Sequence, residues 1–166
     1  MSELQDSMAE ERYEDTMQSK YLVFCLDSQQ FAIAIYNVID IINLQPITRV
    51  PNCPDYISGI TNLRGKVIPI IDLRIRFGKQ MREKGENDRI CIIVVEYSDM
   101  QVGIVVDSVD EVLTMPEGAI SPPPAFNSSS ESRFIEGVAR VENNVYLLLN
   151  CIEVLGQEYL PLIDED

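Results

Sequence analysis

The sequence predicts a mainly β protein, built from two small five-stranded β-barrels that pack together and carry short helical segments. Val and Ile are plentiful, and short apolar runs are broken by Gly, Pro, Asn and Asp, as is typical of strands joined by tight turns. The second half of the chain also repeats the pattern of the first. With 166 residues, of which 46% are hydrophobic, the chain can form two such units.

The repeat emerges when the sequence is compared with itself. At an offset of 71 residues, 22–44 matches the apolar pattern of 93–115. At an offset of 78 residues, 56–78 matches 134–156 without gaps, with identities at Ile57/Ile135, Gly59/Gly137, Val67/Val145 and Gly78/Gly156. Two matches in the same order predict a duplicated unit, with copies at about 20–78 and 91–156. Repetition does not decide which strands pair, so exchange of strands between the barrels remains open.

Each copy reads as a strand, a turn, a second strand, a third strand that ends in a Pro-containing loop, and a hairpin. The predicted hairpin turns are Arg64-Gly65-Lys66 and Glu142-Asn143-Asn144, because Gly and Asn tolerate the positive φ that tight turns need. About five short strands per copy indicate a small closed barrel. A single 60-residue barrel is marginally stable, so we expect two barrels to share an apolar seam.

Three segments fall outside the strand pattern. Residues 1–18 have no sustained periodicity and are predicted to be a flexible acidic tail, and 158–166 form a second acidic tail. Residues 117–132 are predicted to be the one long loop. The two tails hold much of the net charge of −14 and leave about −5 on the rest of the chain. Without a cluster of Lys and Arg, nucleic-acid binding is not expected.

The composition also predicts the cellular location. The apolar run at 90–95 is too short to span a bilayer, and the acidic N-terminus does not resemble a signal peptide. The four cysteines, Cys25, Cys53, Cys91 and Cys151, are far apart and form no CxxC pair. We therefore expect reduced, packed thiols in a cytoplasmic protein rather than a zinc site or disulfides.

Catalytic chemistry has little support in the sequence. The chain has no His, which removes the commonest general base and metal ligand, and no Gly-rich phosphate-binding loop. A carboxylate metal site remains conceivable from Asp40, Asp72, Glu96, Asp107, Asp110 and Glu111. However, Asp72, Asp107 and Asp110 lie at strand ends, where Asp commonly bonds nearby backbone. The sequence favours a non-catalytic interaction module, without cofactor or metal, over the alternative of a carboxylate-metal-dependent hydrolase.

Differences between the two copies point to function, because one copy serves as a control for the other. Asp40 aligns with Glu111, so both copies carry an acid there, whereas Arg64 aligns with Glu142. The "NLRG" turn therefore belongs to the first copy alone, and the barrel does not require its arginine. Two roles for Arg64 remain open. It either forms a structural pair with Asp40, or it offers donors to a partner while Asp40 orients it.

The stretches "YLVFCLDSQQFAIAIYNVIDII", "ITRVPNCPDYISGITNLRGKVIPIIDLR" and "VGIVVDSVDEV" resemble the CheW family of bacterial chemotaxis coupling proteins. The likeness covers about residues 19–157, and "GxxNLRGxxxPxxDLR" is a specific signature. It implies two SH3-like β-barrel subdomains and no catalytic activity. It also implies an adaptor that joins the cytoplasmic tips of chemoreceptors to the regulatory domain of the histidine kinase CheA, at receptor arrays near the inner membrane.

The resemblance further implies which residues contact the receptor. In this family the receptor site maps to the groove between the barrels, and the matching positions here are Val38, Asp40, Asn62, Arg64 and Cys91. The chain departs from the family at Asp40, where a Glu is expected. The shorter side chain raises the question of whether Asp40 can reach Arg64. The resemblance does not indicate which residues meet the kinase.

Overall fold

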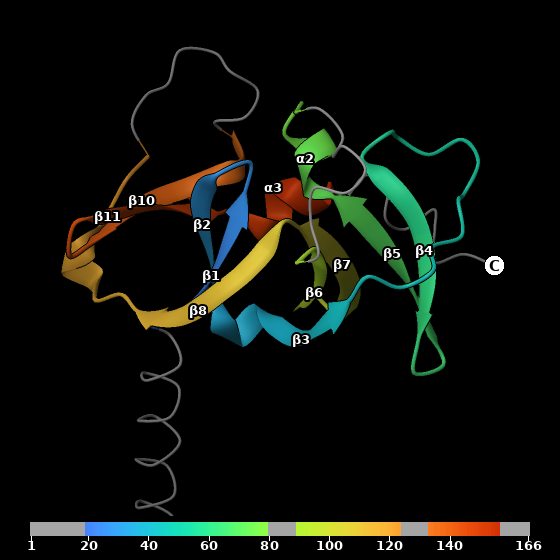
Figure 1. Ribbon diagram of the computed structural model, residues 1–166, viewed down its shortest axis with the longest axis horizontal. Helices are drawn as coiled ribbons and strands as arrows, with labels where there is room; N and C mark the ends of the chain where they lie inside the picture. Colours follow the sequence, from blue (N-terminus) through green and yellow to red (C-terminus); the bar gives the residue numbers. More distant parts are fainter. Residues whose placement is uncertain (1–18, 80–88, 124–132, 157–166) are drawn as a thin grey trace, which may run out of the picture.

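A computed structural model describes residues 19–79, 89–123 and 133–156. The two predicted acidic tails, and the part of the predicted long loop after residue 123, lie outside these residues. The predicted fold class is confirmed, because the described chain is mainly β and forms two packed sheets with only short helical segments (Figure 1). None of its described helices is long and apolar enough to cross a membrane.

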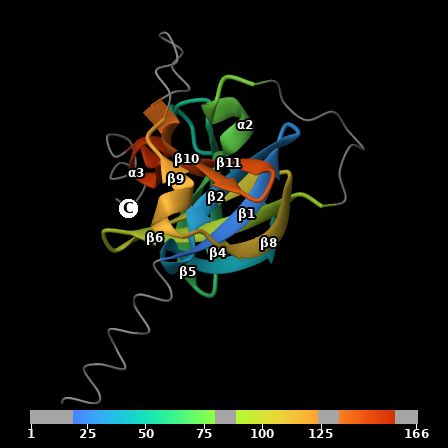
Figure 2. The same cartoon turned by 90° about the vertical axis from the view of Figure 1, so that its left-hand side faces the viewer.

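Subdomain A is a six-stranded sheet. In spatial order its strands are β8 (Ser108–Thr114), β1 (Lys20–Leu26), β2 (Gln29–Ala34), β11 (Asn144–Leu149), β10 (Ile135–Val141) and β9 (Ile120–Ser121). Neighbouring strands are antiparallel except β2 and β11, which are parallel. Figure 2 shows these strands curving around a common interior. The sheet has one strand more than expected, because β9 forms in the segment predicted to be a loop.

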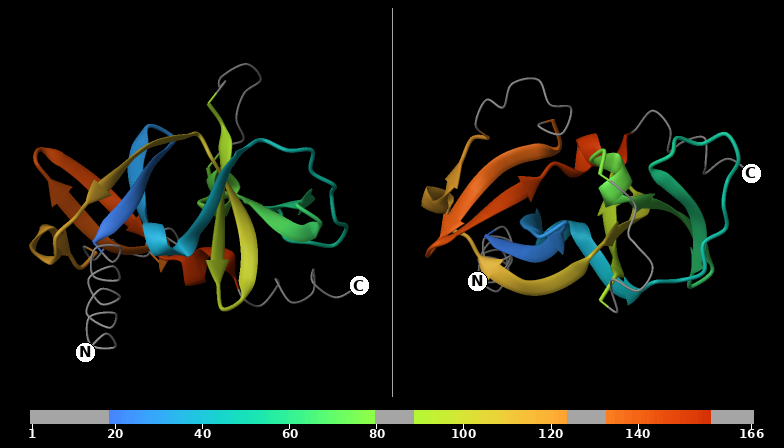
Figure 3. Two further views of the ribbon diagram at one scale, coloured as in Figure 1. Left: turned by 90° about the horizontal axis from the view of Figure 1, so that it is seen from below. Right: turned by 45° about the horizontal axis from the view of Figure 1, so that its top comes forward.

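Subdomain B is a five-stranded sheet. In spatial order its strands are β3 (Val38–Asn43), β6 (Cys91–Tyr97), β7 (Met100–Val106), β5 (Lys66–Asp72) and β4 (Ile57–Leu63). Again one pair, β5 and β7, is parallel. Each subdomain combines strands of both sequence copies, since β3 pairs with β6 while its counterpart β8 pairs with β1. The two subdomains lie side by side in both views of Figure 3.

The short helical segments lie between strands and at the end of each copy. They are η1 (Ile35–Asn37), α2 (Leu73–Arg76), η2 (Glu117–Ala119) and α3 (Cys151–Leu155). Helix α2 follows β5 of subdomain B, and α3 follows β11 of subdomain A. The Asp72 side chain caps α2 by accepting a hydrogen bond from the Arg74 N–H, and Asn150 caps α3 in the same way.

The two copies also share their irregularities. In β3, a β-bulge lies between Val38 and Asp40. In β8, the aligned bulge lies at Asp110, opposite β1. A second bulge precedes both Gly59 and Gly137. Because bulges bend a strand, matching bulges bend the two sheets at equivalent places. Bulges at aligned positions are what a duplicated unit predicts.

A short segment approaches the far edge of each sheet. Among the described residues, the pairing leaves β3 and β4 at the edges of subdomain B, but Thr48, which follows β3, exchanges two backbone hydrogen bonds of 2.8 Å with Ile60 of β4. In subdomain A, β9 follows β8 and pairs with β10. These contacts bring the two edges of each sheet toward each other, so that each sheet approaches a barrel.

Three apolar cores result. Core A, inside subdomain A, includes Val23, Ala139 and Tyr146, and core B, inside subdomain B, includes Ile70 and Ile92. The largest is the seam core between the subdomains, to which both contribute: Leu22, Phe24, Leu26, Phe31, Ile33, Tyr56, Ile57, Ile71, Leu73, Phe77, Ile93, Val95, Val102, Ile104, Val106, Phe134, Leu149, Cys151, Val154 and Leu155. The predicted apolar seam is thus the main core of the molecule.

The closing contact of subdomain B predicts a specific cost for one substitution. Gly59 has φ +148°, and a Cβ there would collide with the backbone oxygen of Thr48. We expect Gly59→Ala to destabilise the protein by more than about 3 kcal/mol in urea unfolding. In the matched variant Gly137→Ala, the new Cβ would lie 3.2 Å from the Ser121 oxygen without a positive φ, so the loss should be about 1 kcal/mol. Equal losses would show that the Thr48 contact does not constrain this strand.

Candidate partner-binding site

The hairpin between β4 and β5 carries the first-copy motif at its tip. Leu63 pairs with Lys66, so the turn consists of Arg64 and Gly65 alone, with φ of 54° and 83°. Two successive residues with positive φ make the tight turn that matches the twist of a hairpin. The Asn62 Oδ1 accepts a hydrogen bond of 2.9 Å from the Gly65 N–H. Asn62 and Gly65 therefore hold the turn and leave the Arg64 side chain at its tip.

Asp40 lies on β3, directly after the bulge. Its Oδ1 accepts a hydrogen bond of 2.9 Å from the Ile41 N–H. Its Oδ2 is shielded from solvent and accepts no well-aligned hydrogen bond from the described residues, but it lies 2.9 Å from Arg64 Nη2. Asp40 pairs in the ladder with Val94 of core B, which places it on the inner face of the strand. The shorter side chain of Asp does reach the arginine.

The two sides of this ion pair differ in exposure. The Arg64 side chain is 79% exposed, whereas that of Asp40 is 24% exposed. An ion pair with one partner this exposed contributes little to stability. The geometry therefore corresponds to an arginine that points outward while Asp40 holds one of its nitrogens. The equivalent positions in subdomain A, Glu111 and Glu142, are both acidic and cannot form such a pair.

The other two residues implied by the resemblance lie farther along β3 and β6. Val38 pairs with Val95 and packs against the seam core. Cys91 pairs with Asn43 at the opposite end of the same ladder. Burial raises the pKa of the Cys91 thiol, and a hydrogen bond with the Val109 backbone opposes this only in part. The structure thus brings Asp40, Asn62 and Arg64 together and leaves Cys91 apart from them.

Exposed apolar side chains lie near the ion pair. Ile39, next to Asp40 on β3, and Val67, beside the hairpin turn, are exposed. Ile41 is also exposed, but it pairs with Ile93 of the seam core and therefore lies on the opposite face of β3 from Asp40. Next to the hairpin lies an open hollow of about 390 Å³, lined by Gln45, Pro46, Thr48, Ile60, Thr61, Asn62 and Val67. An exposed charge with apolar neighbours and an adjoining hollow is typical of a surface that binds another protein.

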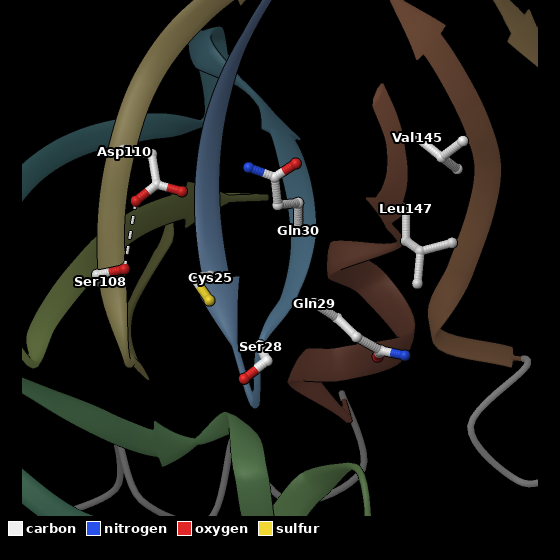
Figure 4. A pocket seen from close by; sticks show the side chains of 8 residues that line it. All are labelled: Cys25, Ser28, Gln29, Gln30, Ser108, Asp110, Val145 and Leu147. Atoms are coloured by element: carbon white, nitrogen blue, oxygen red, sulfur yellow. Dashed lines mark hydrogen bonds between the residues drawn. The ribbon is translucent and has the colours of Figure 1, made fainter. Parts of the chain in front are cut away.

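A second hollow, of about 620 Å³, lies in subdomain A between the β1–β2 hairpin and β11 (Figure 4). It is lined by Cys25, Ser28, Gln29, Gln30, Ser108, Asp110, Val145 and Leu147. Burial, with a smaller contribution from Asp110 and Asp107, raises the pKa of the Cys25 thiol, so the thiol stays protonated at neutral pH. A protonated thiol is a poor nucleophile.

Four of the six acids considered for a metal site have other partners. Asp72 caps α2, Asp107 pairs with Arg74, and Asp110 accepts a hydrogen bond of 3.3 Å from the Ser108 hydroxyl. The Glu96 Oε2 accepts a hydrogen bond of 3.2 Å from the Gln101 side chain. In the part of the chain that the structure describes, no three His, Cys, Asp or Glu side chains lie close enough together to hold a metal ion.

Comparison with known proteins identifies the family. A family model described as a CheW-like domain matches residues 20–158. The chemotaxis protein CheW of Klebsiella aerogenes is 34% identical over 150 residues, covering 90% of this chain and 89% of the relative. The chemotaxis protein CheW of Bacillus subtilis is 34% identical over 139 residues, covering 84% and 88%. The chain belongs to the CheW family.

A solved structure of the same family agrees with this assignment. The crystal structure of the scaffolding protein TtCheW from Thermoanaerobacter tengcongensis matches with a TM-score of 0.73 and 36% identity, covering 81% of this chain and 90% of that one. The resemblance read from the sequence is thereby confirmed. In this CheW-family chain, the ion pair of Asp40 and Arg64 lies on subdomain B, at the turn of the "NLRG" motif.

Sequence reasoning missed two arginines, one at the end of the signature and one two residues beyond it. Arg74 and Arg76, within "DLRIR", make contacts at the seam that are described below. The comparison of copies that singled out Arg64 would have found them, because they align with Ile152 and Val154. That comparison stopped at the hairpin. Asp107, the partner of Arg74, was assigned to local backbone bonding, although its main partner is 33 residues away.

The exposure of Arg64 predicts a small effect on stability. We expect Arg64→Ala to lower the free energy of unfolding by less than about 0.5 kcal/mol, because the Arg64 side chain itself is mostly exposed to water. Asp40→Ala should cost more, about 1 kcal/mol, because the Ile41 N–H also loses its acceptor. Urea unfolding of both variants checks this. A loss of 3 kcal/mol or more for Arg64→Ala would mean that the arginine locks the β3–β4 edges as a structural residue.

Proposed function

We propose that this CheW-family chain is a non-catalytic adaptor that couples the cytoplasmic tips of chemoreceptors to the histidine kinase CheA. Support comes from the family assignment over most of the chain and from the scaffolding role named for the TtCheW structure. The relatives' name, chemotaxis protein, supports the same pathway. In this proposal the chain works in the cytoplasm, at receptor arrays near the inner membrane, and needs no cofactor.

The observation that carries the proposal is the Arg64–Asp40 pair. An exposed guanidinium offers several donors in a fixed plane, and Asp40 holds one of its nitrogens, so the remaining donors point to solvent in a defined orientation. Polar groups at the tip of a receptor hairpin would accept them, and the exposed Val67 of the same β4–β5 hairpin would pack beside that contact. Val38, Asn62 and Cys91 complete the proposed receptor surface, with Cys91 at its far end.

The hydrolase alternative has no comparable support. Two of the acids that it would use, Asp72 and Asp107, already serve a helix cap and an ion pair. A metal hydrolase would also need an open coordination position near a substrate cleft, and the hollow in Figure 4 contributes a single acid, Asp110. We therefore propose binding, not turnover, as the activity of this chain.

Receptor binding tests this proposal. Arg64→Ala should weaken binding of a chemoreceptor cytoplasmic fragment at least tenfold, because charge-assisted hydrogen bonds are lost. The affinity for the CheA regulatory domain should stay within about twofold. Lys66→Ala, which removes a charge from the same hairpin, is the matched control and should bind both partners normally. Titration calorimetry measures the affinity of the wild type and of both variants for each of the two partners.

The proposed role for Asp40 adds a second comparison. Asp40→Glu restores the residue expected in this family and should keep receptor binding, whereas Asp40→Ala should weaken it. An Arg64→Ala variant that folds normally and binds the receptor fragment at wild-type strength would refute the assignment of this site. Wild-type protein that binds neither fragment would refute the proposed function itself.

A further inference from the structure

Helix α2 connects the two subdomains through a buried ion pair. The Arg74 Nε donates to Asp107 Oδ1 at 3.0 Å, and Arg74 Nη2 donates to Asp107 Oδ2 at 2.7 Å. The two side chains are only 13% and 9% exposed. A bidentate contact between a planar guanidinium and a carboxylate restricts both distance and angle, which a single contact from an ammonium group cannot do.

Asp107 occupies the point where the chain crosses from one subdomain to the other. It is the single residue between the end of β7 in subdomain B and the start of β8 in subdomain A. Its N–H donates to the Cys25 oxygen at 3.1 Å, and its Oδ2 also accepts from the Asp27 N–H at 2.8 Å. Through Asp107, Arg74 of subdomain B is therefore fastened to the β1–β2 hairpin of subdomain A.

Arg76, on the same short helix, contacts the other end of subdomain A. Its guanidinium donates to the Glu153 and Val154 oxygens of α3 at 2.9 and 3.0 Å. It also lies over the Tyr56 ring, 3.9 Å from the ring centre. Helix α2 thus holds subdomain A at two separate places, and the two contacts together resist both sliding and rotation.

The second crossing between the subdomains lacks this pair. The repeat aligns Arg74 with Ile152 and Asp107 with Tyr36, and these two residues are 40% and 62% exposed. The fold therefore does not require an ion pair where its chain crosses over. Burying a charged pair also adds little stability compared with apolar residues of similar size. What the ion pair adds at this one crossing is a fixed distance and angle between the two side chains.

We infer that Arg74 is a positioning residue for bridging: its ion pair with Asp107 fixes the angle between the two subdomains. A bridge must present its partner surfaces in a fixed relation, and the receptor surface proposed above lies on subdomain B. Looser coupling would leave each surface intact but lower the probability that both partners are engaged together. This inference rests on the proposed function for its binding consequence, whereas the fixed angle can be tested without any partner.

The experiment replaces the ion pair with apolar residues in the full chain. In the double variant Arg74→Met with Asp107→Leu, residual dipolar couplings measured by NMR report the orientation of each subdomain. Wild-type couplings should fit one common alignment, and those of the variant should fit only when each subdomain is treated separately. Lys79→Met is the matched control, because Lys79 also joins this region to Asp27, at 3.4 Å, but through a single contact.

Binding measurements form the second arm. Affinities for a receptor fragment alone and for the CheA regulatory domain alone should stay within about twofold of wild type. Co-sedimentation measures the assembly of all three proteins. The apparent affinity of this assembly should weaken about tenfold in the double variant and stay unchanged in Lys79→Met. If the double variant does not fold, Arg74→Lys keeps the charge without the two-point contact and should show the same changes to a smaller degree.

The outcomes are distinct. A common alignment in the double variant, or in Arg74→Lys if only that variant folds, overturns the inference. Separate alignments with unimpaired three-protein assembly overturn the link to bridging and leave the proposed function standing. Failure of the wild-type protein to assemble the three components refutes the proposed function, while the alignment data still decide whether Arg74 fixes the angle.

Discussion

The seam core between the subdomains is shared by both sheets and holds them together. Its aromatic residues Phe24, Phe31, Phe77 and Phe134 follow one another, with successive ring centres 5.7, 5.4 and 5.3 Å apart. They come from both copies of the repeat, and so do the strands on either side. Because each subdomain borrows strands from the other copy, neither copy can complete a sheet by itself. Burial of this seam and the pairing of strands therefore stabilise each other.

In this arrangement, the residues that stabilise the fold are separate from the residues that differ between the two copies. Most positions of the seam and the two inner cores are apolar in both copies, with Val154, which aligns with Arg76, as an exception. The hairpin tips and the crossings lie outside these cores, and there the copies differ. Arg64 and its counterpart Glu142 occupy equivalent turns. Both copies carry an acid on the neighbouring strand, and only Arg64 has the opposite charge needed to form an ion pair with it. A duplicated scaffold can thus carry one specialised surface without changing its packing.

Much of the fold follows from the sequence because the repeat is visible in it. Shared apolar positions, together with Gly59 and Gly137, predicted two similar β units and the places of their turns. The exchange of strands could not be predicted, because a repeat specifies strand patterns and not partners. Strand β9 was missed for a related reason: two residues are too few to show an alternating pattern.

The candidate site was predicted in part. The difference between Arg64 and Glu142 pointed to the hairpin, and the structure places Asp40 beside it. Cys91 entered through family resemblance alone, and the ladder puts it at the far end from Val38. The Arg74–Asp107 pair was missed because a strand-end Asp can bond either nearby backbone or a distant side chain. Asp72 accepts from backbone two residues away, whereas Asp107 accepts from the Arg74 side chain and the Asp27 N–H, 33 and 80 residues away, which only the three-dimensional arrangement reveals.

Through the shared seam, the two subdomains should form one cooperative unit. Native-state hydrogen exchange at increasing urea tests it most directly, with amides of Ala139 and Tyr146 reporting on core A and those of Ile70 and Ile92 on core B. We expect the slowest-exchanging amides of both cores to open with the same free energy and the same urea dependence. Two distinct opening free energies, with one subdomain unfolding while the other stays protected, would contradict it.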